Sequence, residues 1–230
     1  MKKIQYLNLE RMDYQTAFDL QTSVNRYLQA HKKEPGFLML VEHPPVFTLG
    51  RNRKSDDFLF PVDMVKNQGF NVVESNRGGN VTYHGPGQIV GYPLVNMEHF
   101  KKDVQWYVWS LEEWIISTLK HFDLVANRKP AYRGVWVGDE KVCAMGVAIK
   151  RWSTMHGFAL NHRTNLDHFH LINPCGITEF GVTSMEKLGC KAEKEQVIDT
   201  LKIEFERIFE CRLEPTTLEE VKKRVHSTES

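Results

Sequence analysis

Three segments of the chain place their apolar residues at the three-and-four spacing of an amphipathic helix. The first begins at Asp13, which is in the position of an N-cap, and runs to about His31. The second covers residues 104–122, and the third covers about 192–209. Each stripe of apolar side chains predicts a helix that packs one face against a hydrophobic core.

Shorter apolar runs between the predicted helices are typical of β-strands. Residues 37–41 form a nearly continuous apolar run that ends before Pro44, as expected of a buried strand. GDEK at 138–141 predicts a hairpin turn. Further strands are predicted at residues 70–74, 132–137, 142–150 and 156–161. This order of elements predicts an α/β or α+β fold, in which a β-sheet is layered with helices.

The composition is that of an ordinary globular protein, and a single domain over residues 1–230 is expected. Of the 230 residues, 41% are hydrophobic and 26% are charged, and the formal net charge is only +1. So small a net charge gives no electrostatic sign of a nucleic-acid partner or of binding to an anionic membrane. The charged tail from Pro215 onward is expected to add a small helix.

The cysteines and the N-terminal residues indicate a cytoplasmic protein. The four cysteines are far apart and form no CxxC pair, so neither a zinc site nor a disulfide framework is expected. The first residues mix charges and amides where a signal peptide needs an apolar run, and no apolar run is long enough to cross a membrane. We therefore expect reduced thiols, no metal and no membrane partner.

A glycine-rich segment, RGGNVTYHGPGQ at residues 77–88, is the first place where chemistry is expected. It follows a predicted strand, and its glycines would let backbone N–H groups come close to a ligand. Arg77, Thr82, Tyr83 and His84 could add polar contacts. The spacing fits neither GxGxxG nor a P-loop, so a phosphate loop is not indicated. A tight surface loop would use the same residues, and the pattern alone leaves both interpretations open.

The two predicted strands between residues 138 and 162 carry two further candidates. Lys141 stands near the start of an apolar strand, where a lysine is usually a solvated charge beside a hairpin turn. His156 precedes Gly157 and could equally be a core histidine with satisfied hydrogen bonds. Neither residue is assigned a function by its position alone.

The stretch NPCGI at residues 173–177 frames a cysteine between a proline and a glycine. Most cysteines are small buried hydrophobes, but here Pro174 fixes the backbone and Gly176 leaves room for an incoming electrophile. A free thiol is only slightly ionised at neutral pH, so Cys175 would need a cation or a base within reach to act as a nucleophile. The candidates are Lys141, His84 and His156, all remote in sequence.

Five motifs together resemble the lipoyl(octanoyl) transferase family. They occur in that family's order and spacing between Glu42 and Met185, so the resemblance covers most of the chain. RGGxxTYHGPGQ together with INPCG is highly specific, whereas either motif alone would be weaker. The motifs are HPPVFTLG (43–50), RGGNVTYHGPGQIVGYPL (77–94), EKVCAMGVAIKRWSTMHGFALN (140–161), INPCGI (172–177) and TSM (183–185).

The resemblance implies an acyltransferase that carries out the first step of endogenous protein lipoylation. Members of the family transfer an octanoyl or lipoyl group from acyl carrier protein to a lysine of a lipoyl domain, without ATP, a cofactor or a metal. The implied acceptors are the lipoyl domains of 2-oxoacid dehydrogenase E2 subunits and the H protein of glycine cleavage. The implied fold is a mixed β-sheet flanked by helices, similar to the catalytic domains of biotin and lipoate protein ligases.

The resemblance also assigns roles to individual residues. Cys175 matches the nucleophile that forms an acyl-thioester, and Lys141 matches the lysine that lowers the pKa of this thiol and assists proton transfer. The matched substrate-binding residues are Arg77, Gly78, Gly79, Asn80, Val81, Thr82, Tyr83, His84, Ala144, Met145, Gly146, Gly157, Phe158 and Ala159.

Two other functions stay open at this point. An ATP-dependent lipoate or biotin ligase of the same fold would activate a free acid as an adenylate, but such enzymes need no cysteine and carry a different glycine loop. A non-catalytic protein that binds acyl carrier protein or lipoyl domains would be expected to lack the nucleophile. Because both Cys175 and Lys141 are present, the transferase is the favoured interpretation.

Overall fold

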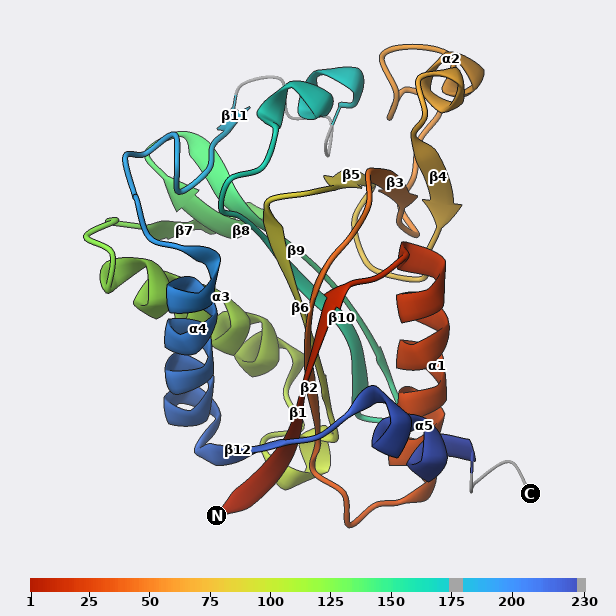
Figure 1. Ribbon diagram of the computed structural model, residues 1–230, viewed down its shortest axis with the longest axis vertical. Coiled ribbons are helices and arrows are strands. Elements are labelled where there is room, and N and C mark those ends of the chain that lie inside the picture. Colours follow the sequence, from red (N-terminus) through yellow and green to blue (C-terminus); the bar gives the residue numbers. More distant parts are fainter. Residues whose placement is uncertain (174–179, 227–230) are drawn as a thin grey trace.

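The computed structural model describes residues 1–173 and 180–226, which form a β-sheet with helices on both faces (Figure 1). In this part of the chain, the large sheet has nine strands in the order β12-β1-β2-β6-β10-β9-β8-β7, and the short strand β11 pairs with β9. Its strands are β1 (Lys2–Arg11), β2 (Gly36–Glu42), β6 (Gln88–Val95), β7 (Asn127–Lys129), β8 (Tyr132–Val137), β9 (Glu140–Lys150), β10 (Ser153–Asn161), β11 (Gly181–Val182) and β12 (Cys211–Pro215).

The large sheet is mixed, which confirms the predicted fold class. Strand β1 lies parallel to both β2 and β12, whereas β2, β6, β10, β9, β8 and β7 pair antiparallel in succession. Strands β8 and β9 are joined at Gly138 and Asp139, so the predicted hairpin turn is confirmed. A second, smaller sheet has the order β4-β3-β5, with the strands Val46–Leu49 (β3), Asn71–Glu74 (β4) and Val81–His84 (β5).

The predicted helices are present within about two residues of the expected ends. Helix α1 begins after Asp13, whose carboxylate accepts a hydrogen bond from the Thr16 backbone N–H at 3.1 Å, as expected of an N-cap. Helices α1 and α5 cover one face of the large sheet, and α3 and α4 cover the other (Figure 1). The helices are α1 (Tyr14–Ala30), α2 (Val62–Asn67), α3 (Val104–Lys120), α4 (Lys194–Phe209) and α5 (Leu218–His226), with 3₁₀ turns at Met97–His99 and Leu166–Leu171. None of the helices in residues 1–173 and 180–226 has the length and apolar character needed to cross a membrane.

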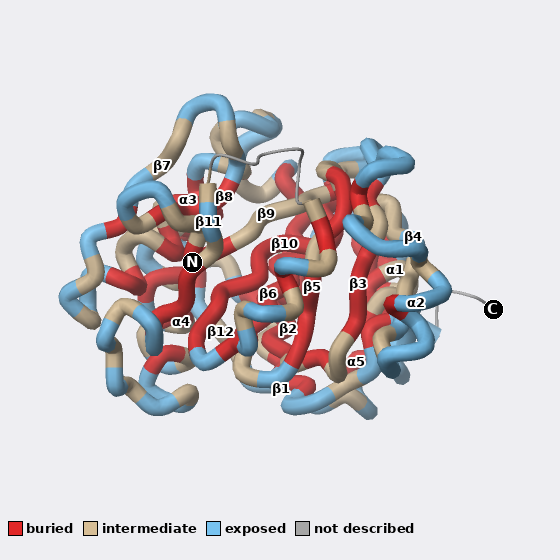
Figure 2. Tube along the Cα trace, turned by 90° about the horizontal axis from the view of Figure 1, so that it is seen from above, coloured by how far each residue is buried: buried red, intermediate tan, exposed pale blue. Residues whose placement is uncertain are grey.

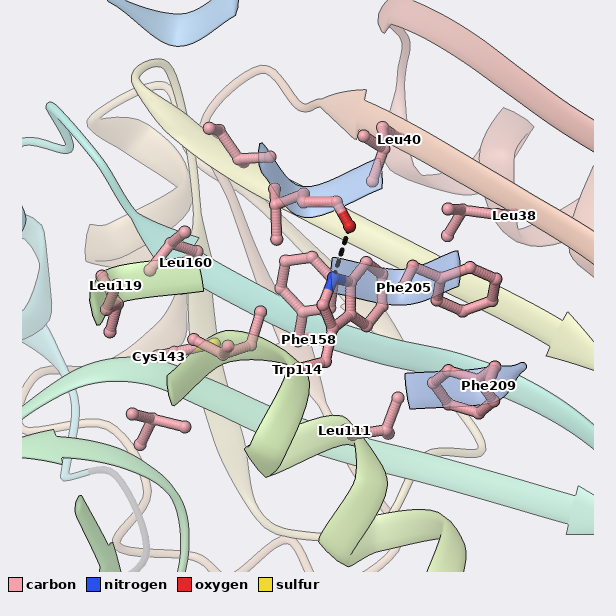
Figure 3. Close-up of a cluster of buried hydrophobic side chains, with 14 of the residues drawn as sticks. Leu38, Leu40, Leu111, Trp114, Leu119, Cys143, Phe158, Leu160, Phe205 and Phe209 are labelled. Carbon is pink, nitrogen blue, oxygen red and sulfur yellow. Dashed lines mark hydrogen bonds between the residues drawn. The ribbon is translucent and has the colours of Figure 1, made fainter. Parts of the chain in front are cut away.

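The central strands are the most deeply buried part of the molecule (Figure 2). Trp114 of α3 packs between the strands and α4, with its ring edge-on to Phe158 of β10 at a centroid distance of 4.8 Å (Figure 3). The Trp114 indole N–H donates to the Leu201 carbonyl at 2.7 Å, so its one polar group is satisfied inside the core. Truncating a buried aromatic of this kind to alanine typically costs about 3–5 kcal/mol.

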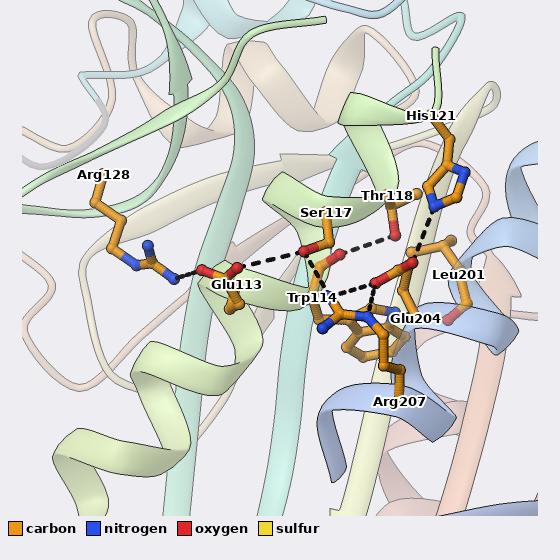
Figure 4. Close-up of polar contacts among 9 residues, drawn as sticks. All are labelled: Glu113, Trp114, Ser117, Thr118, His121, Arg128, Leu201, Glu204 and Arg207. Atoms are coloured by element: carbon orange, nitrogen blue, oxygen red, sulfur yellow. Dashed lines mark hydrogen bonds and ion pairs between the residues drawn. The ribbon is translucent and has the colours of Figure 1, made fainter. Parts of the chain in front are cut away.

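Polar contacts also tie α3 to α4 at the outer edge of this core (Figure 4). Glu204 of α4 is nearly buried, and it accepts hydrogen bonds from His121 at 2.9 Å and from Arg207 at 2.7 Å. Arg207 also donates to Ser117 of α3 at 2.9 Å. These contacts fix the two helices relative to the sheet that they cover.

Strands β1, β3, β6, β7, β11 and β12 are absent from the elements expected from the sequence, and β5 lies in a segment expected to be a loop. In β6, Gly91 and Pro93 argue against a central strand, because proline cannot donate to the ladder. The structure resolves the conflict with side chains: the Thr154 hydroxyl donates to the Pro93 carbonyl at 2.7 Å and accepts from the Val95 N–H at 2.8 Å. Tyr107 donates to the same Pro93 carbonyl at 2.9 Å.

Candidate active site

A cavity of about 510 Å³ opens where the large sheet meets the small one. Its walls come from the glycine-rich segment and β5, from strands β8, β9 and β10, from α3, and from Phe169 and residues 180–182. The wall formed by β9 and β10 carries small or apolar side chains, and polar side chains stand around it. A cavity of this size and character suits a small molecule with a long apolar part.

The structure brings nearly all of the predicted site residues together at this cavity. Those that line it are Arg77, Gly78, Gly79, Asn80, Val81, Thr82, His84, Lys141, Ala144, Met145, Gly146, Gly157, Phe158 and Ala159. Tyr83 is the exception among the described residues: its side chain is buried between Phe47 and Phe169, and its hydroxyl shares a hydrogen bond with His168 at 2.7 Å. Cys175 lies outside the described residues.

Arg77 holds the glycine-rich segment in shape from within. Its guanidinium is nearly buried and donates to the carbonyls of Gly78 at 3.0 Å and Asn80 at 2.9 Å, and to the Thr48 hydroxyl at 3.2 Å. A planar guanidinium with five donors suits such a role, because it can satisfy several loop carbonyls at once. Much of the hydrogen-bonding capacity of Arg77 is therefore used to build the cavity wall.

Glycines allow the backbone segments around the cavity to approach one another closely. The Gly78 N–H donates to the Val147 carbonyl of β9 at 3.0 Å, and a Cβ on Gly146 would lie 3.0 Å from the Gly78 carbonyl oxygen. On β10, a Cβ on Gly157 would come within 2.2 Å of the Gly91 carbonyl oxygen. Larger residues at these positions would push the walls of the cavity apart.

Lys141 is held at the cavity by strand pairing on both sides. It pairs with Trp136 of β8 and with Val182 of β11, and its carbonyl accepts from the Thr183 N–H at 3.0 Å. Its ammonium nitrogen lies 4.7 Å from the centroid of the Trp136 ring, in cation–π contact. A half-buried cation is thus fixed on the cavity wall.

The described residues on either side of segment 174–179 are both anchored at this cavity. Before it, the Asn173 N–H donates to the Asp57 carbonyl at 2.8 Å, and the Asp57 carboxylate accepts from the amide of Asn80 at 3.1 Å. After it, the Phe180 ring lines the cavity and packs against Tyr132 and Trp136 at centroid distances of 5.4 Å. Asn173 is thus linked through Asp57 to Asn80, and Phe180 lies against Trp136, whose ring Lys141 contacts.

Comparison with known proteins identifies the family. Residues 13–206 match the family model of the lipoyl protein ligase A/B catalytic domain. The octanoyltransferase of Caldanaerobacter subterraneus subsp. tengcongensis is 44% identical over 219 residues, which is 95% of each chain. The octanoyltransferase of Desulforamulus reducens is 46% identical over 222 residues, 96% of each chain. The chain belongs to the octanoyltransferase family. It is an acyltransferase.

A solved structure agrees with this assignment at the level of the fold. The bipartite lipoate protein ligase of Thermoplasma acidophilum, described together with its E2 lipoyl domain, superposes with a TM-score of 0.78 over 99% of this chain and 92% of that one. The sequence identity of 15% limits this likeness to the fold. The expected similarity to lipoate protein ligases is confirmed.

Three buried histidines of the transferase lie together next to the cavity. Burial lowers the pKa of His43 to about 4 and that of His156 to about 3, and it holds the pKa of His84 well below its ordinary value. His43 donates from Nδ1 to the Met12 carbonyl at 2.7 Å, so its Nε2 accepts from the Tyr92 hydroxyl, also at 2.7 Å. All three imidazoles are therefore neutral at physiological pH.

The neutral imidazoles of His84 and His156 both border the cavity. His84 donates from Nδ1 to the Gln88 side-chain oxygen at 2.9 Å, and its Nε2 accepts from the Thr48 hydroxyl at 3.5 Å. His156 donates from Nε2 to Asn76, and its Nδ1 has no partner among the described residues. His156 also has a φ of 59° and lies stacked on Phe18, so it is no ordinary strand residue.

Apart from Phe158, the sequence does not reveal the aromatic residues of the site. In the sequence, Tyr14 belongs to the apolar stripe of the first predicted helix, and Trp136 lies within a predicted strand. Nothing in their spacing separates them from core residues, because the side chains around the cavity come from several distant elements. The aromatic wall consists of Tyr14, Tyr92, Tyr132, Trp136, Phe169 and Phe180.

Metal ligation has no visible basis in residues 1–173 and 180–226. Within these ranges, no group of three or more histidine, cysteine, aspartate or glutamate side chains is arranged to hold an ion. The chemistry that the described site can support is binding of an apolar chain, placement of a cation, and hydrogen bonding by neutral imidazoles.

Proposed function

We propose that this cavity is where an octanoyl group passes from acyl carrier protein, through a thioester on Cys175, to a lysine of a lipoyl domain. Lys141 and the three predicted binding segments line one cavity, and relatives at 42–46% identity are named octanoyltransferases. The observation that carries the proposal concerns the residues before and after the NPCGI motif: Asn173 is linked through Asp57 to Asn80 of the cavity wall, and Phe180 packs on Trp136, whose ring Lys141 contacts.

In the first half-reaction, the Cys175 thiolate attacks the carbonyl carbon of the donor thioester. A bond forms between that carbon and the Cys175 sulfur, the bond to the donor sulfur breaks, and the donor leaves as a thiol with a proton from the Lys141 ammonium, which becomes neutral. The Lys141 ammonium favours the thiolate, because an opposite charge within about 4–6 Å lowers a cysteine pKa by one or more units.

In the second half-reaction, the neutral amine of the acceptor lysine attacks the same carbonyl carbon. An amide bond forms, the Cys175 sulfur leaves as a thiolate, and the proton of the amine passes to a base. Neutral Lys141 could take this proton, whereas burial lowers the pKa of His84 and of His156 and makes both histidines poor bases. Backbone N–H groups of the glycine-rich segment are suited to hold the oxyanion. The scheme consumes no ATP.

The octanoyl chain is placed against strands β9 and β10. Ala144, Gly146, Gly157 and Ala159 leave room there for a linear chain, and Phe158 and Met145 add apolar surface. Each methylene that leaves water for such a surface stabilises the complex by about 0.8 kcal/mol. Small wall residues therefore suit an acyl chain of medium length.

The expected acceptors are the lipoyl domains of 2-oxoacid dehydrogenase E2 subunits and the glycine cleavage H protein. A cysteine nucleophile works only where thiols stay reduced, which keeps the cytoplasm as the expected compartment. An ATP-dependent lipoate ligase would share the fold, but relatives that cover 95–96% of this chain carry the name octanoyltransferase.

Intact-mass analysis after mixing the enzyme with octanoyl carrier protein tests the proposal. Without any nucleotide, the wild-type protein should gain the mass of one octanoyl group, and Cys175→Ala should gain none. Cys190→Ala is the matched control, because Cys190 is a partly exposed cysteine outside the proposed mechanism and its loss should leave the adduct intact. A wild-type protein that forms no adduct, or a Cys175→Ala variant that still does, contradicts the mechanism.

A further inference from the structure

The charged side chains among the described residues of the cavity wall are all positive. Among the described residues that line it, Arg77, Arg133 and Lys141 are cations, and none is an aspartate or glutamate. The histidines there are neutral because burial lowers their pKa. A cavity lined by one sign of charge attracts ligands of the opposite sign, so an anionic group is expected to enter it.

Arg133 is the cation of this set that is exposed to solvent. It belongs to β8, and its guanidinium makes no hydrogen bond or ion pair within residues 1–173 and 180–226. Arg77, in contrast, is nearly buried and holds loop carbonyls, and Lys141 is half-buried against Trp136. Arg133 is therefore the cation with donors available to a ligand.

Four acidic side chains on elements that border β8 are engaged by other cations. Glu112 and Glu113 are paired with Arg128, at 3.3 Å and 2.6 Å. On the β8–β9 turn, Asp139 is paired with Lys129 and Glu140 with Lys187, each at 2.6 Å. The charge of Arg133 is thus not neutralised locally by these acids.

Arg133 also stands at a suitable separation from the proposed chemistry. Lys141 pairs with Trp136, and Arg133 lies three residues back along β8, so the backbone positions are up to roughly 10 Å apart at about 3.3 Å per strand residue, less where β8 bulges between Val135 and Trp136. An acyl donor of the kind proposed above holds its thioester at one end of a long flexible phosphopantetheine arm and its phosphate at the other. With the thioester near Lys141, the phosphate would be expected at the rim.

We propose that Arg133 binds the phosphate of the phosphopantetheine arm that presents the acyl group. The inference rests on the proposed function, because it takes the donor to be a phosphopantetheine thioester. A guanidinium recognises phosphate through paired, charge-assisted hydrogen bonds, which a lysine at the same position would not reproduce fully. Arg133 thereby selects donors that carry the phosphate and orients their thioester toward Lys141.

Two small donors separate this role from the rest of the reaction. Octanoyl-4′-phosphopantetheine and octanoyl-pantetheine differ only in the phosphate, and each is supplied to the full-length enzyme with a lipoyl domain as acceptor. The readout is the ratio of their kcat/KM values. For the wild-type enzyme the ratio should favour the phosphorylated donor by about tenfold, the loss expected for one charge-assisted hydrogen bond, and it should shrink at high salt.

Substitution of Arg133 should remove the preference. In Arg133→Gln the ratio should fall to about one, and in Arg133→Lys it should lie between one and the wild-type value. Arg212→Gln, which removes an exposed arginine on β12 away from the cavity, is the control and should keep the wild-type ratio.

The possible failures are distinguishable. Equal use of both donors by the wild-type enzyme, or a ratio retained in Arg133→Gln, overturns the phosphate site while the transferase function stands. The phosphate site is also overturned if Arg133→Gln raises only the KM for the lipoyl domain. If the wild-type enzyme uses neither small donor nor octanoyl carrier protein, the proposed function itself is wrong, and the phosphate site is wrong with it.

Discussion

The ammonium group of Lys141 is held in place by the residues around it. Pairing on both edges of β9 fixes its backbone, and the Trp136 ring lies under its side chain, with the ammonium nitrogen 4.7 Å from the ring centroid. The negative face of an indole stabilises a cation. The side chain can therefore stay charged at the cavity and still be close enough to the surface to exchange protons.

Removing this charge should raise the pKa of the Cys175 thiol. In Lys141→Met, the rate of alkylation by iodoacetamide should rise at a pH that is higher than in the wild-type protein by about one unit or more, because the thiolate loses its neighbouring cation. Lys141→Arg keeps the charge and should stay close to the wild-type profile. The measurement is the pH dependence of the alkylation rate, followed by mass spectrometry.

This experiment needs a background in which other thiols do not interfere. Burial raises the pKa of Cys211 to about 12 and raises that of Cys143 strongly, so both should react slowly. Cys190 is partly exposed and is best replaced by serine. A superimposable pH profile for wild type and Lys141→Met would rule out the proposed effect of the charge.

Much of the site could be predicted from the sequence because the motifs are local, but its aromatic wall could not. The glycines and Lys141 belong to motifs whose order along the chain is readable. Tyr14 and Phe180 are 166 residues apart, and only the fold brings them to one cavity. Tyr83 is the opposite case: it belongs to the glycine-rich motif, but its side chain packs in the neighbouring core instead of lining the cavity.

Among the elements, strands β9 and β10 shape the cavity through close backbone contacts. Gly157 of β10 faces the Gly91 carbonyl of β6, and Gly146 of β9 faces the Gly78 carbonyl of the glycine-rich segment. Strand β10 pairs with both β6 and β9, so a shift at one position is passed to its neighbour. The sheet and the loop therefore fit together only with small residues at these contacts.

An added methyl group should be costly at one of these glycines and tolerated at another. Gly157→Ala would place a Cβ 2.2 Å from a backbone oxygen, which no rotation of a side chain can relieve, and should lower the free energy of unfolding by about 1–3 kcal/mol. At Gly78 the nearest atom would be 3.5 Å from the new Cβ, and φ is not in the left-handed region. Gly78→Ala should therefore stay within about 0.5 kcal/mol of wild type.

Urea titrations of both variants, followed by far-ultraviolet circular dichroism, check the expectation. Both substitutions add one methyl group to a glycine. The difference between their urea midpoints of unfolding therefore depends on how much space each site has for that group. Equal stabilities for Gly157→Ala and Gly78→Ala would mean that β6 can move away from β10 at little cost.

Helices were easier to predict than the strands around the site. An apolar stripe at helical spacing is visible over seventeen residues in α3, whereas β6 carries Gly91 and Pro93 within a strand that is buried throughout. Its irregular pairing is completed by the hydroxyl of Thr154, about 60 residues later. A contact that depends on so distant a side chain leaves no local pattern. Likewise β1 alternates imperfectly, because its buried Ile4 and Leu7 are three residues apart.

For the molecule as a whole, forming the cavity requires the burial of several polar side chains beside it. Tyr14 stacks on His84 at a centroid distance of 5.6 Å, and His43 lies edge-on to both rings. These groups are buried with their imidazoles neutral, since a charged imidazole there would lose its hydration. The region proposed as the reaction site therefore makes the folded state sensitive to acid.

Acid should destabilise the fold through these histidines before most carboxylates are protonated. Their folded-state pKa values lie below the value of about 6.5 expected in the unfolded chain, at about 4 for His43 and about 3 for His156. Between pH 6.5 and 4 the unfolded chain binds more protons than the folded one, so the free energy of unfolding falls as the pH falls. The slope should approach about 1.4 kcal/mol per pH unit for each such histidine.

Replacing one histidine measures how much that residue contributes to the pH dependence of the free energy of unfolding. His43→Gln can still donate to the Met12 carbonyl and accept from Tyr92, but it cannot take up a proton. Urea unfolding measured from pH 7 to pH 4.5 should therefore show a shallower loss of stability than in wild type, by up to about 1.4 kcal/mol per pH unit. His170→Gln replaces an exposed histidine and should keep the wild-type slope. Parallel curves for wild type and His43→Gln would show that His43 is protonated equally in the folded and unfolded states, and that its burial in the fold does not govern the acid sensitivity.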